Sequence, residues 1–168
     1  MEILAITILV PLGGITIIAL FAALTLLFPT PVEKTRLNLE NSLWRSLLLG
    51  VVNFIFFGLL AALFISLAER TGEILGGILV LLTGIIVVGF AIFAIIGLSA
   101  FANLLGERIG GGKTAFASNL RGGALLVLSA LVPYVGWFIF LPLVLWAGFG
   151  AAISALLRRE KAPAIESE

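Results

Sequence analysis

The chain contains no cysteine, histidine, aspartate or glutamine among its 168 residues. Without cysteine it can form neither a thiolate nucleophile nor a disulfide. Without cysteine and histidine it lacks the ligands that zinc sites usually require, and histidine-ligated haem or chlorophyll is excluded on the same ground. We therefore expect no catalytic residue, no metal site and no cofactor, and we expect that the protein is not an enzyme.

Charged side chains are also scarce, since they make up 11% of the chain whereas 61% of its residues are hydrophobic. A soluble domain has about half apolar and about a quarter charged residues. The mean hydropathy of +1.26 leaves too little polar surface to cover a water-exposed globule. A net charge of +1 offers no basic face that could neutralise several phosphates, so we expect no nucleic-acid partner. The composition predicts an integral membrane protein surrounded by the lipid bilayer.

The few charged residues divide the chain into four long uncharged stretches. Each stretch exceeds the roughly 20 residues that a helix needs to cross ~30 Å of hydrocarbon. We predict an all-α, polytopic integral membrane protein, with a single helical membrane domain over residues 1–157 and a short polar tail over 158–168. The uncharged stretches cover residues 3–32, 46–68, 74–106 and 122–157.

The first three stretches predict one transmembrane helix each. We place these spans at about residues 3–28, 46–68 and 77–100. The third stretch is longer than one span needs, so we expect it to continue as an interfacial extension through Leu105.

A helix start signal follows the first span. Thr30 can cap a helix, Pro31 suits the first helical position, and Glu33 stands where a capping box places its carboxylate. We predict a short interfacial helix from this point to Trp44, and it leads into the second span at Ser46.

The last stretch, residues 122–157, is too long for one span, because 36 residues give ~54 Å of helix. Residues 132–136 (VPYVG) interrupt it near its centre. Two arrangements are open. Either residues 114–131 and 137–157 form a transmembrane hairpin, or residues 122–131 form only a short re-entrant helix.

Two observations favour the transmembrane hairpin. Tyr134 and Trp137 flank the break, and such amphipathic rings prefer the headgroup level. A hairpin also places every basic residue except Arg70 on the side of the C-terminus, nine against one, whereas four simple crossings would give six against four. The positive-inside rule then predicts that the N-terminus lies outside and the C-terminus lies in the cytoplasm.

Two short motifs carry a resemblance to a known group of proteins. They are residues 28–31 (FPTP) before the amphipathic connector, and residues 131–137 (LVPYVGW) before the last apolar helix, with two long apolar blocks between them. This pattern resembles a group of uncharacterised bacterial polytopic membrane domains, some of which are attached to bactofilin-like polymer-forming proteins. The resemblance covers most of residues 15–157, without the β-helical polymerising domain. It implies a membrane-embedded helical fold, no known catalytic residue and a bacterial inner membrane.

Two polar side chains stand out within the predicted spans. Asn53 lies in the first half of the second span, where it could belong to a substrate site. We favour an interhelical hydrogen bond, which is worth about 0.6 kcal/mol in lipid. Arg121 lies about seven residues inside the fourth span. Its side chain is long enough to reach the headgroups, so we favour an anchoring role over a charge that serves a transport pathway.

The last span carries small residues on one face. Ala147, Ala151 and Ala155 recur every four residues, and Gly148 with Ala152 forms a second row beside them. At 3.6 residues per turn this face is flat, so another helix can approach it closely and gain dispersion contacts. It could pack inside the chain or against an external partner, and both remain open. The opposite, lipid-facing side is predicted to carry Phe140, Val144 and Leu156.

These features together favour a non-enzymatic membrane scaffold or accessory subunit. Its partners would be larger membrane proteins or further copies of itself. The alternative is a small channel or carrier for a neutral or lipidic solute, with a path around Asn53 and the broken hairpin, because discontinuous helices mark transporter sites.

Overall fold

The computed structural model describes residues 2–110 and 114–157, with side chains from Ile8 onward, and within these ranges it contains helices and no strand. Four helical segments are long and apolar enough to cross a membrane, which confirms the prediction of an all-helical membrane protein at that level. Lys113 and the polar tail over 158–168 lie outside the described residues. The helices are α1 (Glu2–Leu27), α2 (Pro29–Asn41), α3 (Leu43–Ala68), α4 (Glu73–Gly110), α5 (Ala115–Ala130), the short π-helix η1 (Gly136–Phe140) and α6 (Leu141–Leu157).

The start of α2 differs from the predicted capping box. Phe28 is the N-cap residue, no side chain caps the helix, and the first turn contains Pro29 and Pro31. The two prolines set the helical backbone angle where an unpaired N–H would otherwise be exposed. Glu33 is therefore not needed as a cap, and its carboxylate accepts hydrogen bonds from Arg36 instead.

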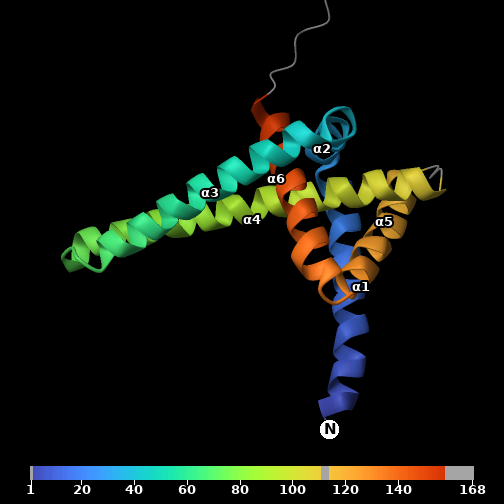
Figure 1. Cartoon of the computed structure of the whole chain (residues 1–168), viewed down its shortest axis with the longest axis horizontal. Coiled ribbons are helices and arrows are strands. Elements are labelled where there is room, and N and C mark those ends of the chain that lie inside the picture. The colour runs from blue at the N-terminus through green and yellow to red at the C-terminus, as the bar shows by residue number, and fades with distance from the viewer. Residues whose placement is uncertain (1, 111–113, 158–168) are drawn as a thin grey trace, which may run out of the picture.

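The helix α2, which the sequence predicts as an interfacial helix, buries part of its surface in the bundle. Its Val32 and Leu39 are 2% and 1% exposed. They pack in one apolar cluster with Ala100 and Leu104 of α4 and with the small residues of α6. The connector between the first two spans therefore covers the core of the bundle (Figure 1).

The helix α4 is the axis of the fold. It is one continuous helix of 38 residues, ~57 Å long, and its buried part extends beyond Ala100. Ala100, Ala102 and Leu104 are buried, so the segment predicted as an interfacial extension packs inside the bundle. The other helices pack against this segment because its small residues allow close approach.

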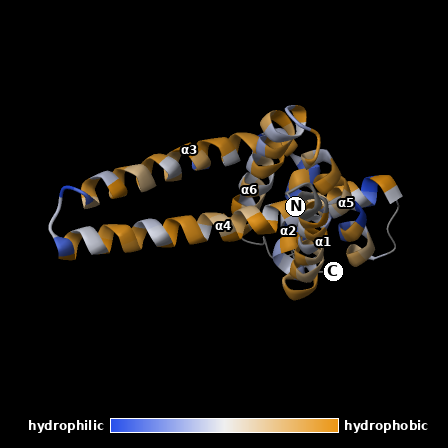
Figure 2. Cartoon of the chain, turned by 90° about the horizontal axis from the view of Figure 1, so that it is seen from below, coloured by the Kyte–Doolittle hydropathy of each residue, from blue (hydrophilic) through white to orange (hydrophobic). Residues whose placement is uncertain are grey.

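The distal parts of α3 and α4 form an arm, which we define as residues 56–89. Figure 1 shows the arm projecting from the bundle to the left, whereas α1 projects downward, crosswise to it. Figure 2 shows apolar residues along both helices of the arm and hydrophilic residues at the turn that joins them. Only 6% of the most apolar segment of α3 and 11% of that of α4 is buried.

The helices α5 and α6 are joined by a tight turn. Tyr134 adopts a φ of 63°, and the indole nitrogen of Trp137 donates to the carbonyl oxygen of Ala130 across the turn, at 2.8 Å. A π-helix comes directly after this turn. Pro142 has no N–H to donate to the Phe138 carbonyl four residues earlier, and the wider π-helical turn accommodates this missing hydrogen bond.

The two helices open into a V instead of packing along each other as a closed hairpin. Figure 1 shows α1 and α4 passing between them. The helix α5 has 16 residues, ~24 Å, and is shorter than the four segments that can span a membrane.

The bundle is held together at backbone contacts between helices. A Cβ atom added to Gly97 of α4 would lie 2.2 Å from the carbonyl carbon of Gly148 on α6. A Cβ atom added to Gly106 of α4 would lie 1.7 Å from the carbonyl oxygen of Ser118 on α5. A Cβ atom added to Gly50 of α3 would lie 1.8 Å from the carbonyl oxygen of Trp146 on α6. Such close crossings are typical of membrane helices, where dispersion replaces the hydrophobic effect as the source of packing energy.

Candidate functional site

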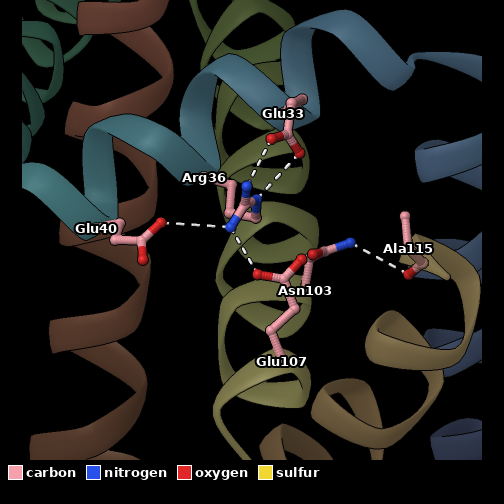
Figure 3. A network of polar contacts seen from close by, with 6 residues as sticks. All are labelled: Glu33, Arg36, Glu40, Asn103, Glu107 and Ala115. Atoms are coloured by element: carbon pink, nitrogen blue, oxygen red, sulfur yellow. Dashed lines mark hydrogen bonds and ion pairs between the residues drawn. The ribbon is translucent and has the colours of Figure 1, made fainter. Parts of the chain in front are cut away.

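An ion-pair network joins α2 to α4. The guanidinium of Arg36 donates to Glu33 through Nε and Nη2, at 3.0 and 2.6 Å, and to Glu40 through Nη1, at 3.4 Å. The same Nη1 donates to Oε2 of Glu107, 71 positions later in the chain, at 2.6 Å (Figure 3). The Arg36 side chain is only 14% exposed, so this pairing is less screened than a surface ion pair.

The network shifts the pKa values of Glu33 and Arg36. The hydrogen bonds from Arg36 lower the pKa of Glu33, against a smaller opposing effect of burial. The hydrogen bonds to Glu33 raise the pKa of Arg36 in turn. Both groups therefore stay ionised, and the arrangement supports docking of α2 instead of proton transfer.

A second polar cluster, which we call the polar seam, lies where α1, α4 and α5 meet. It consists of Thr25, Ser99, Asn103, Ser118 and Asn119, all of them buried. The amide nitrogen of Asn119 donates to the hydroxyls of Thr25 and Ser99. These two hydroxyl oxygens lie 3.3 Å apart, and both donate to the carbonyl oxygen of Phe21, at 3.1 and 3.0 Å.

The second amide of the seam joins α4 to the start of α5. The Nδ2 of Asn103 donates to the carbonyl oxygen of Ala115 at 3.2 Å (Figure 3). Three buried polar atoms of the seam have no hydrogen-bond partner among the described residues, and these are Oδ1 of Asn103, Oγ of Ser118 and Oδ1 of Asn119. The seam is composed of neutral amides and hydroxyls, so it can orient helices or bind a small hydrogen-bond donor, but it offers no acid–base pair.

The hydrogen bonds of the polar seam are expected to stabilise the folded protein. We expect Asn119→Leu to lower the free energy of unfolding by about 1–3 kcal/mol, because it leaves two buried hydroxyls without their donor. The matched control is Asn53→Leu, since the amide of Asn53 bonds only within its own helix, and we expect it to change stability by less than about 0.5 kcal/mol. Thermal unfolding of both variants in detergent measures the difference. Equal melting temperatures would show that the seam contributes no stability.

Neither of the two predicted intramembrane polar residues is hydrogen-bonded to the seam. Asn53 is half-buried, and its Nδ2 donates to the carbonyl oxygen of Leu49 one turn earlier, at 2.7 Å. The predicted interhelical bond is therefore wrong. Arg121 is exposed, and its Nη1 donates to the carbonyl oxygen of Gly110 at 3.0 Å. It caps the C-terminal end of α4, where a cation also complements the helix dipole.

The small-residue face of α6 is directed into the bundle. Four of its residues are buried and Ala155 is half-buried, with the core of α2 and α4 against them. The expected lipid-facing side is wrong for Val144, which is 2% exposed and packs with Phe21, Ala102 and Leu126. Phe140 is half-buried and Leu156 is exposed. The buried residues of the face are Ala147, Gly148, Ala151 and Ala152.

Sequence reasoning missed the seam and the ion-pair network. One signal for the seam was present. Residues at equal distances on either side of a helix–turn–helix break face each other in an antiparallel pair. Asn103 and Asn119 are each eight residues from residue 111, within the glycine run that separates the two helices. The pairing of Arg36 with Glu107 has no comparable local signal.

Two cavities lie between the helices. One cavity of about 540 Å³ lies between α2, α4 and α6, and another of about 260 Å³ lies beside Asn53. Within residues 2–110 and 114–157, no group of three acidic, histidine or cysteine side chains could hold a metal ion.

Comparisons with protein-family models, curated proteins and solved structures find no match to this chain. Its class therefore rests on its own features. Four long apolar helical segments, with polar groups gathered at helix junctions, define an all-helical integral membrane protein.

Proposed function

We propose that the chain is a non-enzymatic scaffold or accessory subunit of a membrane assembly, and that the arm contacts its partners. The observation that carries this proposal is the placement of glycines. Gly58, Gly77, Gly84 and Gly89 lie on the arm, and a Cβ added to any of them would meet no atom within 4 Å. Several glycines of the bundle, in contrast, lie against the backbone of a neighbouring helix, and these include Gly50, Gly97, Gly106 and Gly122.

Open glycines need an explanation because each one weakens its own helix by about 1 kcal/mol relative to alanine. In membrane helices, glycine is enriched where another helix approaches closely. Within the described chain no atom of a neighbouring helix lies within 4 Å of a Cβ built at these four positions. A helix of another membrane protein, or of a second copy, would supply the missing contact.

The partner proposal is tested by purifying the tagged protein in mild detergent and identifying stoichiometric companions by mass spectrometry. We expect a membrane protein or a second copy at a defined ratio. Gly84→Leu should abolish this association while leaving the melting temperature unchanged, because its surroundings are open.

The matched control is Val88→Leu, an exposed position one turn further along α4. It should retain the partner. A companion that stays bound to the Gly84→Leu protein would show that the arm does not form the interface, and a strictly monomeric wild type would contradict the proposal.

For the membrane topology, we propose that the N-terminus lies outside and that the C-terminus lies in the cytoplasm, in a bacterial inner membrane. The exposed Tyr134 and Trp137 at the α5–α6 turn support this, since such rings favour the headgroup level. In Figure 1 this turn and the start of α1 lie at one end of the bundle, and α2 with Arg36 lies at the other.

The topology is tested with single cysteines, which label cleanly because the chain has none of its own. Val135→Cys and Thr71→Cys should react with an impermeant thiol reagent from outside, and Ser42→Cys should not. Labelling at Thr71 would also show that the arm crosses the bilayer, which requires the arm to reorient relative to α1, because the two lie crosswise (Figure 1). A protected Val135 would contradict the transmembrane hairpin.

A carrier for a neutral or lipidic solute is the second function that an observation favours. The cavity of about 260 Å³ is lined by Asn53 and otherwise by apolar side chains of α3, α4 and α6. Purified protein in liposomes that accelerates solute exchange would support this function, and Asn53→Leu should then abolish the exchange.

A further inference from the structure

Three buried polar atoms of the polar seam have no hydrogen-bond partner among the described residues. They are Oδ1 of Asn103, Oγ of Ser118 and Oδ1 of Asn119. The three residues are at most 1% exposed, so bulk solvent cannot solvate these atoms. Buried polar side chains are generally bonded to protein or to ordered water, and three exceptions within one cluster point to a bound ligand.

The neighbouring hydrogen bonds fix the orientation of the Asn119 amide. The hydroxyls of Thr25 and Ser99 both donate to the carbonyl oxygen of Phe21, so their own oxygens can accept. Nδ2 of Asn119 donates to both of these hydroxyl oxygens. Exchanging the nitrogen and oxygen of this amide would place an acceptor against two hydroxyls whose protons are already engaged. Oδ1 of Asn119 is therefore turned away from these hydroxyls.

The orientation of the Asn103 amide is fixed in a similar way. Its Nδ2 donates to the carbonyl oxygen of Ala115 at 3.2 Å, and the exchanged amide would bring two acceptor oxygens together at this point. Both orphan amide oxygens are acceptors only. No rearrangement of protons within these two amides can satisfy them.

Contacts between α4 and α5 bracket Asn103 on both sides. One turn before it, Ser99 accepts the hydrogen bond from Asn119 at 3.4 Å. Three residues after it, Gly106 lies against the backbone of Ser118, where an added Cβ would be 1.7 Å from the carbonyl oxygen. The side chain of Asn103 therefore lies at the level of the two α5 residues that carry the other orphan atoms.

The two amides also lean toward each other. A side chain on an α-helix tilts toward the N-terminus of its own helix. Because α4 and α5 run in opposite directions, Asn103 tilts toward the level at which Asn119 is bonded, and Asn119 tilts toward the level at which Asn103 is bonded. These levels are one turn apart, ~6 Å, and the tilt reduces the separation of the amide oxygens. A water molecule with two hydrogen bonds of about 2.8 Å joins oxygens that are about 4.5–5.5 Å apart.

The three orphan atoms match the hydrogen-bonding capacity of water. A water molecule can donate one proton to each amide oxygen and accept the hydroxyl proton of Ser118, and buried waters typically make about three hydrogen bonds. A sodium ion could also contact oxygen atoms. The side chains of the seam are all neutral, however, and an uncompensated charge within a membrane bundle is costly.

We infer that the polar seam binds one internal water molecule, which bridges Asn103 of α4 to Ser118 and Asn119 of α5. The water completes the hydrogen bonding of a junction that is surrounded by apolar side chains, and it joins the two helices at a second point besides the bond to Ala115. The inference is independent of the arm and of the partner proposed for it.

A crystal structure of the full-length protein, at a resolution that shows ordered water, tests the site directly. We expect one density peak within hydrogen-bond distance of Oδ1 of Asn103, Oγ of Ser118 and Oδ1 of Asn119. Direct hydrogen bonds among these three atoms, with no peak between them, would overturn the inference.

The sign of a stability change gives a second test in detergent. Ser118→Ala should lower the melting temperature by about 2–4 °C relative to Ser66→Ala, because it removes one hydrogen bond to the water. Ser66 is an exposed serine within α3, so this control measures the gain in helix propensity alone. In a dry seam, Ser118→Ala would instead remove an unsatisfied hydroxyl. A melting temperature equal to or above that of Ser66→Ala would therefore contradict a bound water.

Replacing sodium by choline at constant ionic strength separates water from a cation. We expect the wild-type melting temperature to stay the same, because water is present in both buffers. A melting temperature that rises with sodium concentration, and that does so less in Ser118→Ala than in Ser66→Ala, would identify a cation site and overturn the inference.

Discussion

Gly97→Ala is expected to destabilise the bundle by about 1–3 kcal/mol, whereas Gly84→Ala on the same helix should be neutral or slightly stabilising. A Cβ atom on Gly97 would lie 2.2 Å from the carbonyl carbon of Gly148, so α4 and α6 would have to separate to accommodate it. Around Gly84 no atom lies within 4 Å of that position, so alanine there gains helix propensity without a clash.

Thermal unfolding in detergent compares the two variants under identical conditions. The reciprocal change, Gly148→Ala, should resemble Gly97→Ala, because its added Cβ would meet the backbone of Gly97 at 2.7 Å. If the Gly97→Ala and Gly84→Ala variants have the same melting temperature, the backbones of α4 and α6 are not in contact where the helices cross. The packing described for the bundle would then be wrong.

The contrast between these glycines shows what the sequence could and could not predict. Long uncharged stretches indicate membrane helices directly, because a charge within hydrocarbon is costly. The sequence therefore predicted the helical class and the approximate positions of α1, α3 and α4. It could not separate Gly84 from Gly97, since both lie in the same apolar helix and only the neighbouring helices distinguish them.

The error at Val144 has the same physical origin. In a soluble helix, polar residues mark the exposed side, and the contrast with apolar residues identifies the buried face. In α6 almost every side chain is apolar, so only side-chain size distinguished one face from the other. Val144 lies opposite the small residues and was therefore predicted to face lipid. The structure buries α6 on two sides, against one cluster that contains Ala151 and another that contains Val144.

The polar sites were predictable to different degrees. Arg36 was treated as one more cation for the positive-inside count, yet its closest interhelical partner, Glu107, is 71 positions away. That pairing depends on how α2 folds back over α4, which no local pattern encodes. The seam residues Asn103 and Asn119 were more accessible to reasoning, because an antiparallel pair brings positions at equal distances from its turn together.

The helix-packing face of α6 supports the other large expected effect. Ala151 is 0% exposed and lies in the cluster that contains Val32 and Leu39 of α2. Its carbonyl oxygen also accepts a hydrogen bond from Nδ2 of Asn38, at 3.4 Å. A phenyl ring at this position would have to displace α2. We therefore expect Ala151→Phe to lower the free energy of unfolding by about 3 kcal/mol or more, or to prevent folding.

The control for Ala151→Phe is the same substitution at Ala91, an exposed position on α4. Ala91→Phe should elute and melt like the wild type, because its ring would enter lipid or detergent. Because Val144 is buried, Val144→Phe should also be harmful, contrary to the expectation for a lipid-facing residue. Gel filtration and thermal unfolding in detergent separate these cases. Should Ala151→Phe match Ala91→Phe in both measurements, α2 is not packed on this face, and the face would be exposed to lipid or to an external partner.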